Sequence, residues 1–379
     1  MIFVNTSLRK NHKYGVVKGM AVSKQPKVTI IVPAYNTGNY ISKCLNSLKE
    51  QTLHDIEIVV VVDGATDDTE KIARDFANTD ERFKVVVTEN KGSASAKNTG
   101  IQNSSGSEYL MFIDSDDWIE PESCEELYAS AKKNKVDIVT FGYYRVYPDG
   151  KSINETKNKT CNKSYFDTKL FEPVDYLGDF ISFYGMGVTN KFISAEFINS
   201  NGLMFETDHQ VHAEDLYFSY SALFCKPLVY VLNKPFYNYY QRSSSALHSD
   251  ATGIGQRYMQ LFERIELKLN ERSPNEEFKP LLSWLFYYML TFTLYNWYNC
   301  EFKWLYKEFK PFKNSSLYLN YMYYAKKVKR IENETVNGWF LRKTFATLFT
   351  ARLKGLAFGT LILRIVLYKR VKSNIKGEK

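Results

Sequence analysis

One short segment, residues 56–62, limits the folds open to this chain more than any other. Its near-continuous run of isoleucine and valine is typical of a strand covered on both faces, as in parallel sheets. Further apolar runs at 28–32, 83–87 and 108–113 alternate with segments of helical spacing. Strands that alternate with helices of about ten residues predict a mostly parallel sheet with flanking crossover helices. The expected fold class is therefore α/β.

Composition divides the chain into three parts. Residues 1–26 are mixed and polar, which predicts a loose N-terminal extension. Residues 27–250 hold the alternating pattern, and within them 228–232 and 236–240 predict a strand pair around a turn at 233–235. Residues 251–379 predict a helical C-terminal region that is basic and rich in aromatic residues.

The charge and the cysteines exclude several classes of protein. The net charge is +8, with basic residues concentrated after about residue 300, but no zinc-finger, helix-turn-helix or RNP-like pattern supports a nucleic-acid partner. The five cysteines are widely spaced and lack a Cys-x-x-Cys pair, as expected for reduced structural thiols. The chain shows no signal peptide and no run of about 20 apolar residues. We expect a cytoplasmic protein that also acts at the inner face of the cell membrane.

Three carboxylates follow the apolar run that ends at residue 113: Asp114, Asp116 and Asp117. In open α/β sheets the ligand crevice lies at the carboxyl ends of the strands. An Asp-x-Asp pair there suits Mg²⁺ or Mn²⁺, which would bridge to phosphate oxygens of a substrate. The alternative is an acidic turn that caps the next helix, since Pro121 and Glu122 resemble a helix first turn.

Two other strand ends carry polar groups. Residues 32–36 form a Val-Pro-Ala-Tyr-Asn turn, which fits either a nucleotide crevice or a proline-terminated strand with an aromatic plug. Asp63 ends the strand at 56–62, where it is able to accept hydrogen bonds from a base or ribose, and Gly64 permits a tight turn. Thr66 and the two acids after it resemble a helix cap.

Small residues open a helix predicted over 93–102, whose amino end would face an anion. Lys97 lies one helical turn past Ser93 and reaches the same side. The alternative, a small-residue helix packed closely on the sheet, explains Gly92, Ala94 and Ala96 but leaves Lys97 unexplained.

A second acidic pair, Glu214 and Asp215, precedes an apolar helical run. A carboxylate there would act as general base toward a hydroxyl nucleophile, and helix capping is the competing interpretation. His209 and His212 with Glu214 have the residue types of a metal cluster, but such residues in a polar loop usually face solvent, so we expect no metal there.

Four motifs in order, at 32–36, 62–67, 92–100 and 112–118, make this chain resemble the family 2 glycosyltransferases of the GT-A fold. The resemblance covers about residues 28–242 and is highly specific. It implies inverting transfer of a sugar from a nucleotide donor, usually UDP-linked, with Mn²⁺ or Mg²⁺ on the diphosphate. Bacterial members commonly build capsule, exopolysaccharide, teichoic acid or other surface glycans.

The resemblance also implies roles for individual residues. Pro33 and Tyr35 would flank the uracil, and Asp63 would hydrogen-bond its base edge. Asp116 would ligate the metal, while Asp114 would contact the ribose or sugar. Lys97 would contact the donor diphosphate or ribose. Glu214 and Asp215 would form the family's acidic pair, with Asp215 as the catalytic base. Lys191 and Arg242 would lie near the donor phosphates and the acceptor.

Two departures from the family pattern matter. The family often has Asp-Asp-Gly-Ser at 62–65, where this chain has Val-Asp-Gly-Ala, which leaves the nucleotide preference open. Lys97 stands where arginine is common, so the charge is kept but the bidentate geometry is lost.

The basic, aromatic segment 340–370 has the composition of a membrane-interface helix, which would suit a lipid-linked acceptor. The equally good alternative is a helix packed on the catalytic domain or on a partner subunit. The expected function is transfer from a UDP-sugar to a hydroxyl of a glycan or lipid-linked acceptor, or else a non-catalytic nucleotide-sugar-binding scaffold. A dinucleotide-binding oxidoreductase would need Gly-x-Gly-x-x-Gly after the first strand, and a processive synthase several membrane spans.

Overall fold

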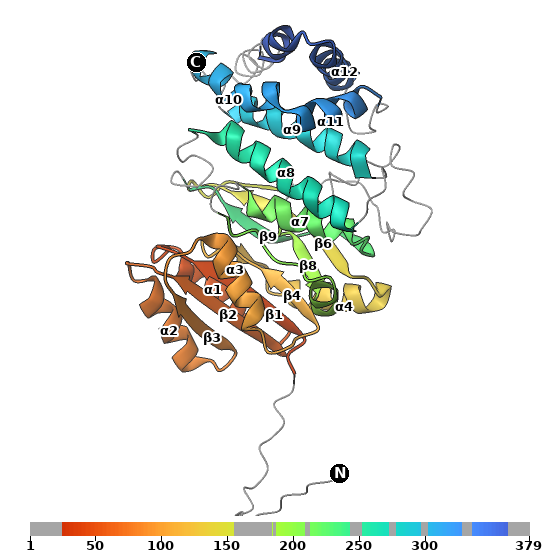
Figure 1. The fold of residues 1–379 in the computed structure, drawn as a ribbon. Helices are drawn as coiled ribbons and strands as arrows, with labels where there is room; N and C mark the ends of the chain where they lie inside the picture. The colour runs from red at the N-terminus through yellow and green to blue at the C-terminus, as the bar shows by residue number, and fades with distance from the viewer. Residues whose placement is uncertain are drawn as a thin grey trace, which may run out of the picture.

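The computed structural model describes residues 25–154, 184, 187–208, 213–242, 252–272, 278–296, 302–327 and 336–362. A single sheet with flanking helices forms one half of this part of the chain, and further helices stack above it (Figure 1). The strands are β1 (Val28–Ala34), β2 (Ile56–Asp63), β3 (Phe83–Thr88), β4 (Tyr109–Phe112), β5 (Trp118–Ile119), β6 (Ile138–Val146), β7 (Ser152–Asn154), β8 (Lys191–Ser194) and β9 (Val229–Tyr240). The helices among them are α1 (Ile41–Lys49), α2 (Thr69–Thr79), α3 (Ser93–Gln102), α4 (Ser123–Asn134), α6 (Ala195–Ser200) and α7 (Glu214–Phe224).

The strand order is β3-β2-β1-β4-β8-β6-β9-β5, with β7 paired to β6. The first four strands are parallel, β8 is antiparallel to its neighbours β4 and β6, and β6 and β9 are again parallel. The predicted α/β class with a mostly parallel sheet is confirmed. Because the chain builds outward from β1 to β3 and then returns to place β4 on the other side of β1, the order reverses there. A ligand crevice forms at such a reversal, outside the carboxyl ends of the strands.

The sequence predicts that Pro33 ends the first strand, and this prediction is wrong. The strand β1 continues to Ala34, and Pro33 pairs with Val61 of β2. On its other side β4 has already ended, since its last register pair is Ile31 with Phe112. A proline lacks an N–H donor, and at this point the sheet requires none.

The predicted strand pair at 228–232 and 236–240 is also wrong. Both segments belong to β9, one strand of twelve residues that runs parallel to β6. The register shifts between Phe141 and Gly142 and again after Gly142, opposite the 233–235 segment. Residues that read as a turn therefore form an irregularity within one strand, which is how a sheet accommodates extra residues and a proline.

Helix α3 has the bounds that the sequence predicted, and it packs closely on the sheet. A Cβ atom added to Gly100 would lie 2.3 Å from Cγ2 of Ile31, so only glycine permits this approach. The side-chain amide of Asn98 exchanges two hydrogen bonds with the backbone of Phe205, at 2.9 and 2.8 Å. The close-packing interpretation of the small residues is thus confirmed, and the same helix buries Lys97.

The C-terminal region is helical, as expected: α8 (Ile254–Arg272), α9 (Lys279–Asn296), α10 (Phe302–Asn314), α11 (Ser316–Lys327), α12 (Val336–Thr350) and a short helix over 354–362. These helices form layers above α7 (Figure 1), and their aromatic residues share one continuous core with α7 and the sheet. Phe262 stacks on Phe286 at 3.9 Å between ring centroids. The buried carboxylate of Glu308 accepts the N–H groups of Gly253 and Gly255, which satisfies the amino end of α8.

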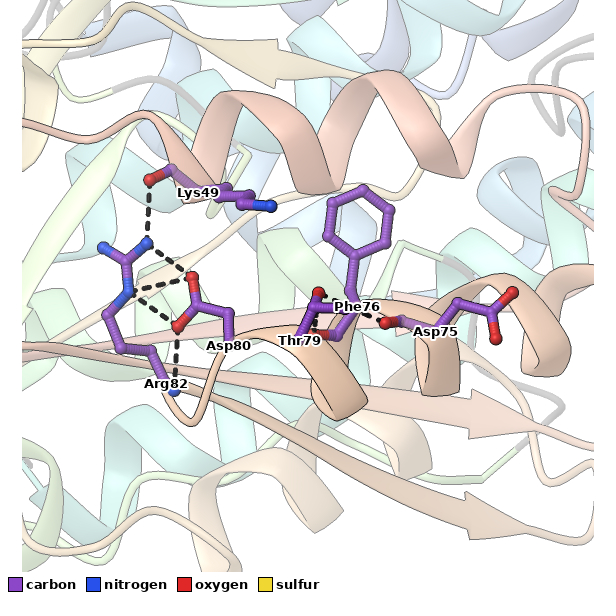
Figure 2. A network of polar contacts seen from close by, with 6 residues as sticks. All are labelled: Lys49, Asp75, Phe76, Thr79, Asp80 and Arg82. Atoms are coloured by element: carbon purple, nitrogen blue, oxygen red, sulfur yellow. Dashed lines mark hydrogen bonds and ion pairs between the residues drawn. The ribbon is translucent and has the colours of Figure 1, made fainter.

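The end of α2 is fastened to α1 by a small polar network (Figure 2). The guanidinium group of Arg82 donates to both carboxylate oxygens of Asp80 and, at 2.8 Å, to the carbonyl of Lys49. The hydrogen bonds from Arg82 hold the pKa of Asp80 below its ordinary value. This network fixes the start of β3 and thereby the edge of the parallel half of the sheet.

We expect Arg82→Ala to lower the free energy of unfolding by about 1–3 kcal/mol, because Asp80 and the Lys49 carbonyl lose a charged donor. Arg74→Ala is the matched control, since its ion pair with Glu70 is exposed and worth about 0.3–0.5 kcal/mol. Urea unfolding of both variants measures the difference. A carboxyl group whose pKa is lower in the folded than in the unfolded protein stabilises the fold at pH values above its unfolded pKa. The difference in unfolding free energy between the wild type and Arg82→Ala should therefore shrink as the pH falls through the pKa of Asp80. Equal losses at neutral pH would contradict this role.

Candidate functional site

The loops after β1, β2 and β4 are joined by hydrogen bonds into one framework at the carboxyl end of the sheet. The side-chain oxygen of Asn36 accepts the N–H of Thr66 at 2.8 Å, and Asp67 accepts the N–H of Gly38 at 2.8 Å. The hydroxyl of Thr37 donates to Ser115 at 3.0 Å, which ties the first loop to the acidic cluster. Asn36 adopts a positive φ of 49°, which asparagine tolerates better than most residues. The crevice expected from the strand order therefore has a rigid rim.

Pro33 and Tyr35 lie at the first of these strand ends. Pro33 is half-buried in β1, whereas the ring of Tyr35 is 49% exposed directly after the strand. An exposed aromatic ring on a fixed turn is a surface on which a planar base can stack.

Asp63 is 2% exposed and organises a neighbouring loop. Its two carboxylate oxygens accept the N–H groups of Lys91 at 2.9 Å and Gly92 at 2.8 Å, and the hydroxyl of Thr88 at 3.2 Å. Gly64, with φ of 67°, has no room for a side chain, because a Cβ would lie 2.6 Å from the nitrogen of Asn90. A carboxylate accepts about four hydrogen bonds, and Asp63 makes three of them with this loop.

Lys97 and the acidic pair form the most buried charged cluster of the site. The ammonium group of Lys97 lies 2.5 Å from Oδ1 of Asp215 and 3.2 Å from Oε1 of Glu214. The Lys97 side chain is 3% exposed, while both carboxylates are 28% exposed. Lys97 thus forms an ion pair with both members of the acidic pair. The carboxylates, not the ammonium, face the crevice.

The electrostatics follow from this arrangement. Burial alone would lower the pKa of Lys97, but the nearby carboxylates outweigh it and raise that pKa above its ordinary value. Burial would raise the pKa of Glu214, yet the charge of Lys97 keeps it below the ordinary value. Asp114 is half-buried at the end of β4, and burial raises its pKa to about 7 in spite of Lys97. The site therefore concentrates three carboxylates around one cation.

The acidic pair begins α7, because Glu214 and Asp215 occupy its first turn. The preceding Ala213 has a left-handed φ of 65° and provides no side-chain cap. The helix dipole favours carboxylates at this end, so the two acids stabilise the start of α7 by their charge, as the capping interpretation requires. Their direct partner is nevertheless Lys97, more than a hundred residues earlier.

Asp116 pairs with Arg242, which follows the end of β9. Nε of Arg242 lies 2.8 Å from Oδ2 of Asp116, but the N–H is not directed at an acceptor among the described residues. The guanidinium also lies over the ring of Tyr40, at 5.6 Å from its centroid. The pair is held by charge rather than by a well-directed hydrogen bond, so a cation is favoured next to Asp116.

We tested whether these residues fit Mn²⁺ or Mg²⁺. Within the described part of the chain, no group of three or more histidine, cysteine or acidic side chains is arranged to hold a metal ion. A full protein cage is not needed, because Mg²⁺ usually binds through one or two carboxylates together with substrate phosphates and water. The Asp116 carboxylate, 15% exposed and beside a cation, fits such a site.

Asp117 is not a helix cap. Helix α4 begins six residues later, at Ser123, with Glu122 at the capping position. The Asp117 carboxylate is 1% exposed and accepts the hydroxyl of Tyr237 at 2.6 Å and the N–H of Tyr240 at 2.8 Å. Burial raises its pKa well above the ordinary value. Asp117 therefore attaches the end of β9, and with it Arg242, to the acidic cluster.

Lys191 is fully buried at the start of β8. Its ammonium group donates to the carbonyl of Tyr184 at 2.7 Å, to the carbonyl of Gly187 and to the side chain of Asn190. Burial lowers its pKa to about 7, against the opposing effect of Asp215. Lys191 thus holds Tyr184, Gly187 and Asn190, and Gly187 also accepts a hydrogen bond from Ser219 of α7. The side chain of Lys191 is fully buried.

His209 and His212 lie outside the described residues. Three of the five cysteines are described, and Cys44, Cys124 and Cys225 are free thiols, which agrees with the expectation for that part. None of the described helices has the length and apolar character needed to cross a membrane.

The sequence analysis missed the tyrosines that complete the site. Tyr237 donates to Asp117, and its oxygen accepts the backbone N–H of Asp114 at 3.2 Å. Tyr240 contacts the rings of Tyr40 and Trp118 at 5.9 and 6.2 Å. No local pattern signals these roles, because the partners are separated by about 120 residues or more. The alternating aromatic residues of 236–240 indicated only a strand.

Comparisons with known proteins agree with this geometry. The family model described as "Glycosyl transferase family 2" matches residues 29–195. The protein named "Putative glycosyltransferase EpsH", from Bacillus subtilis, is 34% identical over 262 residues, which cover 68% of this chain and 73% of EpsH. "Glycosyltransferase GlyG" of Streptococcus pneumoniae is 30% identical, with 59% and 73% covered. This chain spans only 31% of "Glycosyltransferase GlyA" from the same species, at 35% identity.

Solved structures support the fold. S. aureus TarS 1–349, crystallised with UDP-GlcNAc, aligns over 93% of this chain and 92% of its own, with a TM-score of 0.62 and 20% identity. The alignment includes the helical C-terminal region, so the GT-A fold expected from the motifs is confirmed. The sequence identity to EpsH over most of that protein's length, together with the family match, shows that this chain belongs to glycosyl transferase family 2.

Proposed function

We propose that this glycosyltransferase moves a sugar from a UDP-linked donor to a hydroxyl of a glycan or lipid-linked acceptor, with inversion, during bacterial surface-polysaccharide synthesis. The observation that carries the proposal is the pair of partly exposed carboxylates, Glu214 and Asp215, held on Lys97 beside the acidic cluster. Relatives named hyaluronan and chondroitin synthase support a polysaccharide product, although this chain spans only 14–16% of them. TarS, which has the same fold, holds UDP and UDP-GlcNAc in its crystals. The donor sugar would then be a hexose or an N-acetylhexosamine.

In this proposal Asp215 is the general base that removes the proton from the acceptor hydroxyl. Its ion pair with Lys97 keeps the carboxylate in one orientation. Glu214 binds the substrate next to it. The attack then comes from the face of the sugar opposite the departing UDP, which inverts the anomeric carbon.

On the donor side, Tyr35 and Pro33 would contact the base, and the remaining acceptor position of Asp63 would bind its edge. Asp114 would contact the ribose or the sugar, and Asp116 would hold Mn²⁺ or Mg²⁺. When bound, such an ion offsets the charge that grows on the diphosphate of the leaving group. Arg242 lies beside Asp116 and can turn its guanidinium toward the same phosphates.

The alternative is a nucleotide-sugar-binding scaffold without turnover. A scaffold has no use for a base on the acceptor side. The buried Lys97 gives Glu214 and Asp215 a fixed, charged arrangement, which favours the enzyme over the scaffold.

We also retain a membrane surface as a proposed partner, reached from the cytoplasm, since lipid-linked acceptors lie there. The basic segment that suggested it begins at residue 340, but residues 341–350 pack within the helical stack. Arg342 is fully buried and donates to the carbonyl of Ala325 at 2.7 Å. Phe345 and Phe349 are buried as well. The packing alternative therefore holds for 341–350, and a membrane contact must use another surface.

Asp215→Asn should lower the transfer rate by about 10²–10⁴-fold, because the amide cannot accept the proton of the acceptor hydroxyl. UDP binding should stay near the wild-type value, since Asp215 contacts no donor group in the proposal. Transfer assays and UDP titration calorimetry measure both quantities. Glu214→Gln is the matched comparison: if it abolishes transfer while Asp215→Asn does not, the base assignment passes to Glu214. Wild-type transfer in both variants would reject the acidic pair as the base, whereas UDP binding without transfer in the wild type would favour the scaffold.

Lys97→Met should shift the acidic limb of the pH–rate profile to higher pH. Removing the ammonium takes away the charge that holds the pKa of Glu214, next to the base, below its ordinary value, so the pKa of Glu214 rises. The variant should also lose about 3–5 kcal/mol of stability, because the carboxylates remain partly buried without a partner. Lys97→Arg keeps the charge and should retain the wild-type profile. An unshifted acidic limb in a folded Lys97→Met protein would show that Lys97 does not act on the base.

Asp116→Asn should weaken UDP binding in the presence of Mn²⁺ by roughly tenfold or more, and leave binding in chelator unchanged. The amide is a much poorer ligand for a divalent ion than the carboxylate. Calorimetric titrations with Mn²⁺ and with chelator give the two affinities. Asp75→Asn, an exposed acid on α2, is the control for loss of one negative charge. If Mn²⁺ strengthens UDP binding equally in both variants, Asp116 is not the ligand.

A further inference from the structure

The outward face of α10 is strongly basic. Its exposed or half-buried side chains recur at helical spacing along one side, while Leu305, Phe309 and Phe312 are buried on the other. The residues of the outward face are Lys303, Tyr306, Lys307, Lys310 and Lys313. We refer to these five residues, together with residues 351–356, as the basic face.

The segment 351–356 extends this face at one end of α10. The ammonium group of Lys354 donates to the carbonyl of Lys313 at 2.6 Å. The ring of Tyr306 lies 6.0 Å from that of Phe358, and its hydroxyl accepts from Lys313 at 2.7 Å. The turn after α12 and the side of α10 are therefore adjacent, and they form one continuous surface.

Two leucines of the segment 351–356 are exposed and do not pack on the hydrophobic core. Leu353 is 51% and Leu356 is 56% exposed. In a turn of this kind the residue at the position of Leu353 usually packs back on the helix. Here both apolar side chains are exposed, next in sequence to Arg352 and Lys354, and Lys354 contacts Lys313 of α10.

The positive charges of the basic face have no acidic partners in the structure as described. None of its lysines, nor Arg352, forms an ion pair with a described carboxylate, and the one acid within α10, Glu308, is buried under Gly253 and Gly255. Burial and then the charges of Lys313 and Arg352 lower the pKa of Lys354, which shows how closely the cations gather. Such a cluster attracts an anionic surface.

Arg352 occupies a position that favours glycine. Its φ is 65°, and the N–H groups of Arg352 and Leu353 bond to the carbonyls of Phe349 and Leu348, as in the left-handed turn that commonly ends a helix. An arginine there is strained relative to glycine. The chain thus accepts strain to place a cation beside two exposed leucines.

We propose that the basic face is a membrane-contact surface for anionic lipid. Lysines around exposed leucines and a tyrosine match an interfacial element whose cations meet head groups while its apolar side chains enter the acyl boundary. A nucleic acid would use the cations but leave Leu353 and Leu356 exposed, so lipid is favoured. The surface gives the membrane contact of the proposed function a location, but it operates whether or not the chain transfers sugar.

The test is co-sedimentation of the full-length protein with vesicles of phosphatidylcholine alone or with about a third of phosphatidylglycerol. The wild type should bind the mixed vesicles and not the neutral ones, with binding that weakens in high salt. Lys307→Glu with Lys310→Glu should reduce binding by an order of magnitude or more, at roughly fivefold for each charge removed. Lys71→Glu with Lys133→Glu changes the net charge equally at exposed sites on α2 and α4, and should bind like the wild type.

Two further variants separate the apolar and the charged contributions. Leu353→Ser with Leu356→Ser should weaken binding several-fold, whereas Leu267→Ser, at a 58% exposed leucine of α8, should not. Arg352→Gly should weaken vesicle binding while keeping or raising the melting temperature, because glycine relieves the positive φ. That combination excludes unfolding as the cause of lost binding.

The proposal is overturned if the wild type ignores phosphatidylglycerol, or if the Lys71 and Lys133 control loses as much binding as the Lys307 and Lys310 variant. It is also overturned if the leucine variant binds vesicles normally and a single-stranded RNA homopolymer competes for the wild type, which would assign the face to polyanions in general. UDP titration of the same proteins is an independent measurement. A failure of vesicle binding with intact UDP binding rejects this surface and leaves the proposed transferase untouched.

Discussion

The site depends on a single buried cation. Lys97 enters the protein interior from α3, and an ammonium group there would be strongly unfavourable without partners. Its partners, Glu214 and Asp215, come from the first turn of α7, which follows the parallel strands β1 to β4 in the sequence. The ion cluster therefore fixes the relation between the strand-end loops and the helix that carries the acidic pair. It also determines which groups of the cluster face outward: the carboxylates are partly exposed, and the ammonium is not.

Around this cluster the structure connects each strand end to the next. Asn36 holds Thr66, Thr37 holds Ser115, and Asp63 holds the backbone after β3. Most of these polar groups thus bind other groups of the protein. Such a framework is rigid before a substrate arrives, which reduces the conformational entropy lost on binding. Asp116 differs, since its partner Arg242 is attached mainly by charge and can be displaced by a stronger cation.

Much of the fold followed from local patterns. The apolar run at 56–62 and its neighbours indicated parallel strands, and α3 has the predicted bounds because small residues and Gly100 permit only a close helix there. Patterns failed where distant neighbours decide. Pro33 continues its strand because β4 stops short beside it, and 233–235 stays within β9 because β6 pairs on both sides of the irregularity. Asp117 reads as a helix cap locally, but Tyr237 and Tyr240 take its carboxylate.

By itself the sequence determined the class of the protein: the order of strands and helices, the family motifs, and the residue types gathered at the strand ends. These are local properties, set by side-chain periodicity and by short spacings. Only the tertiary structure decided what each charged group contacts. It paired Lys97 with the acidic pair, buried Lys191 against the carbonyl of Tyr184, and placed Arg242 beside Asp116. The reason is that a charge in a protein is governed by its burial and nearest partners, and the partners of Lys97 and Arg242 lie more than a hundred residues away in the sequence.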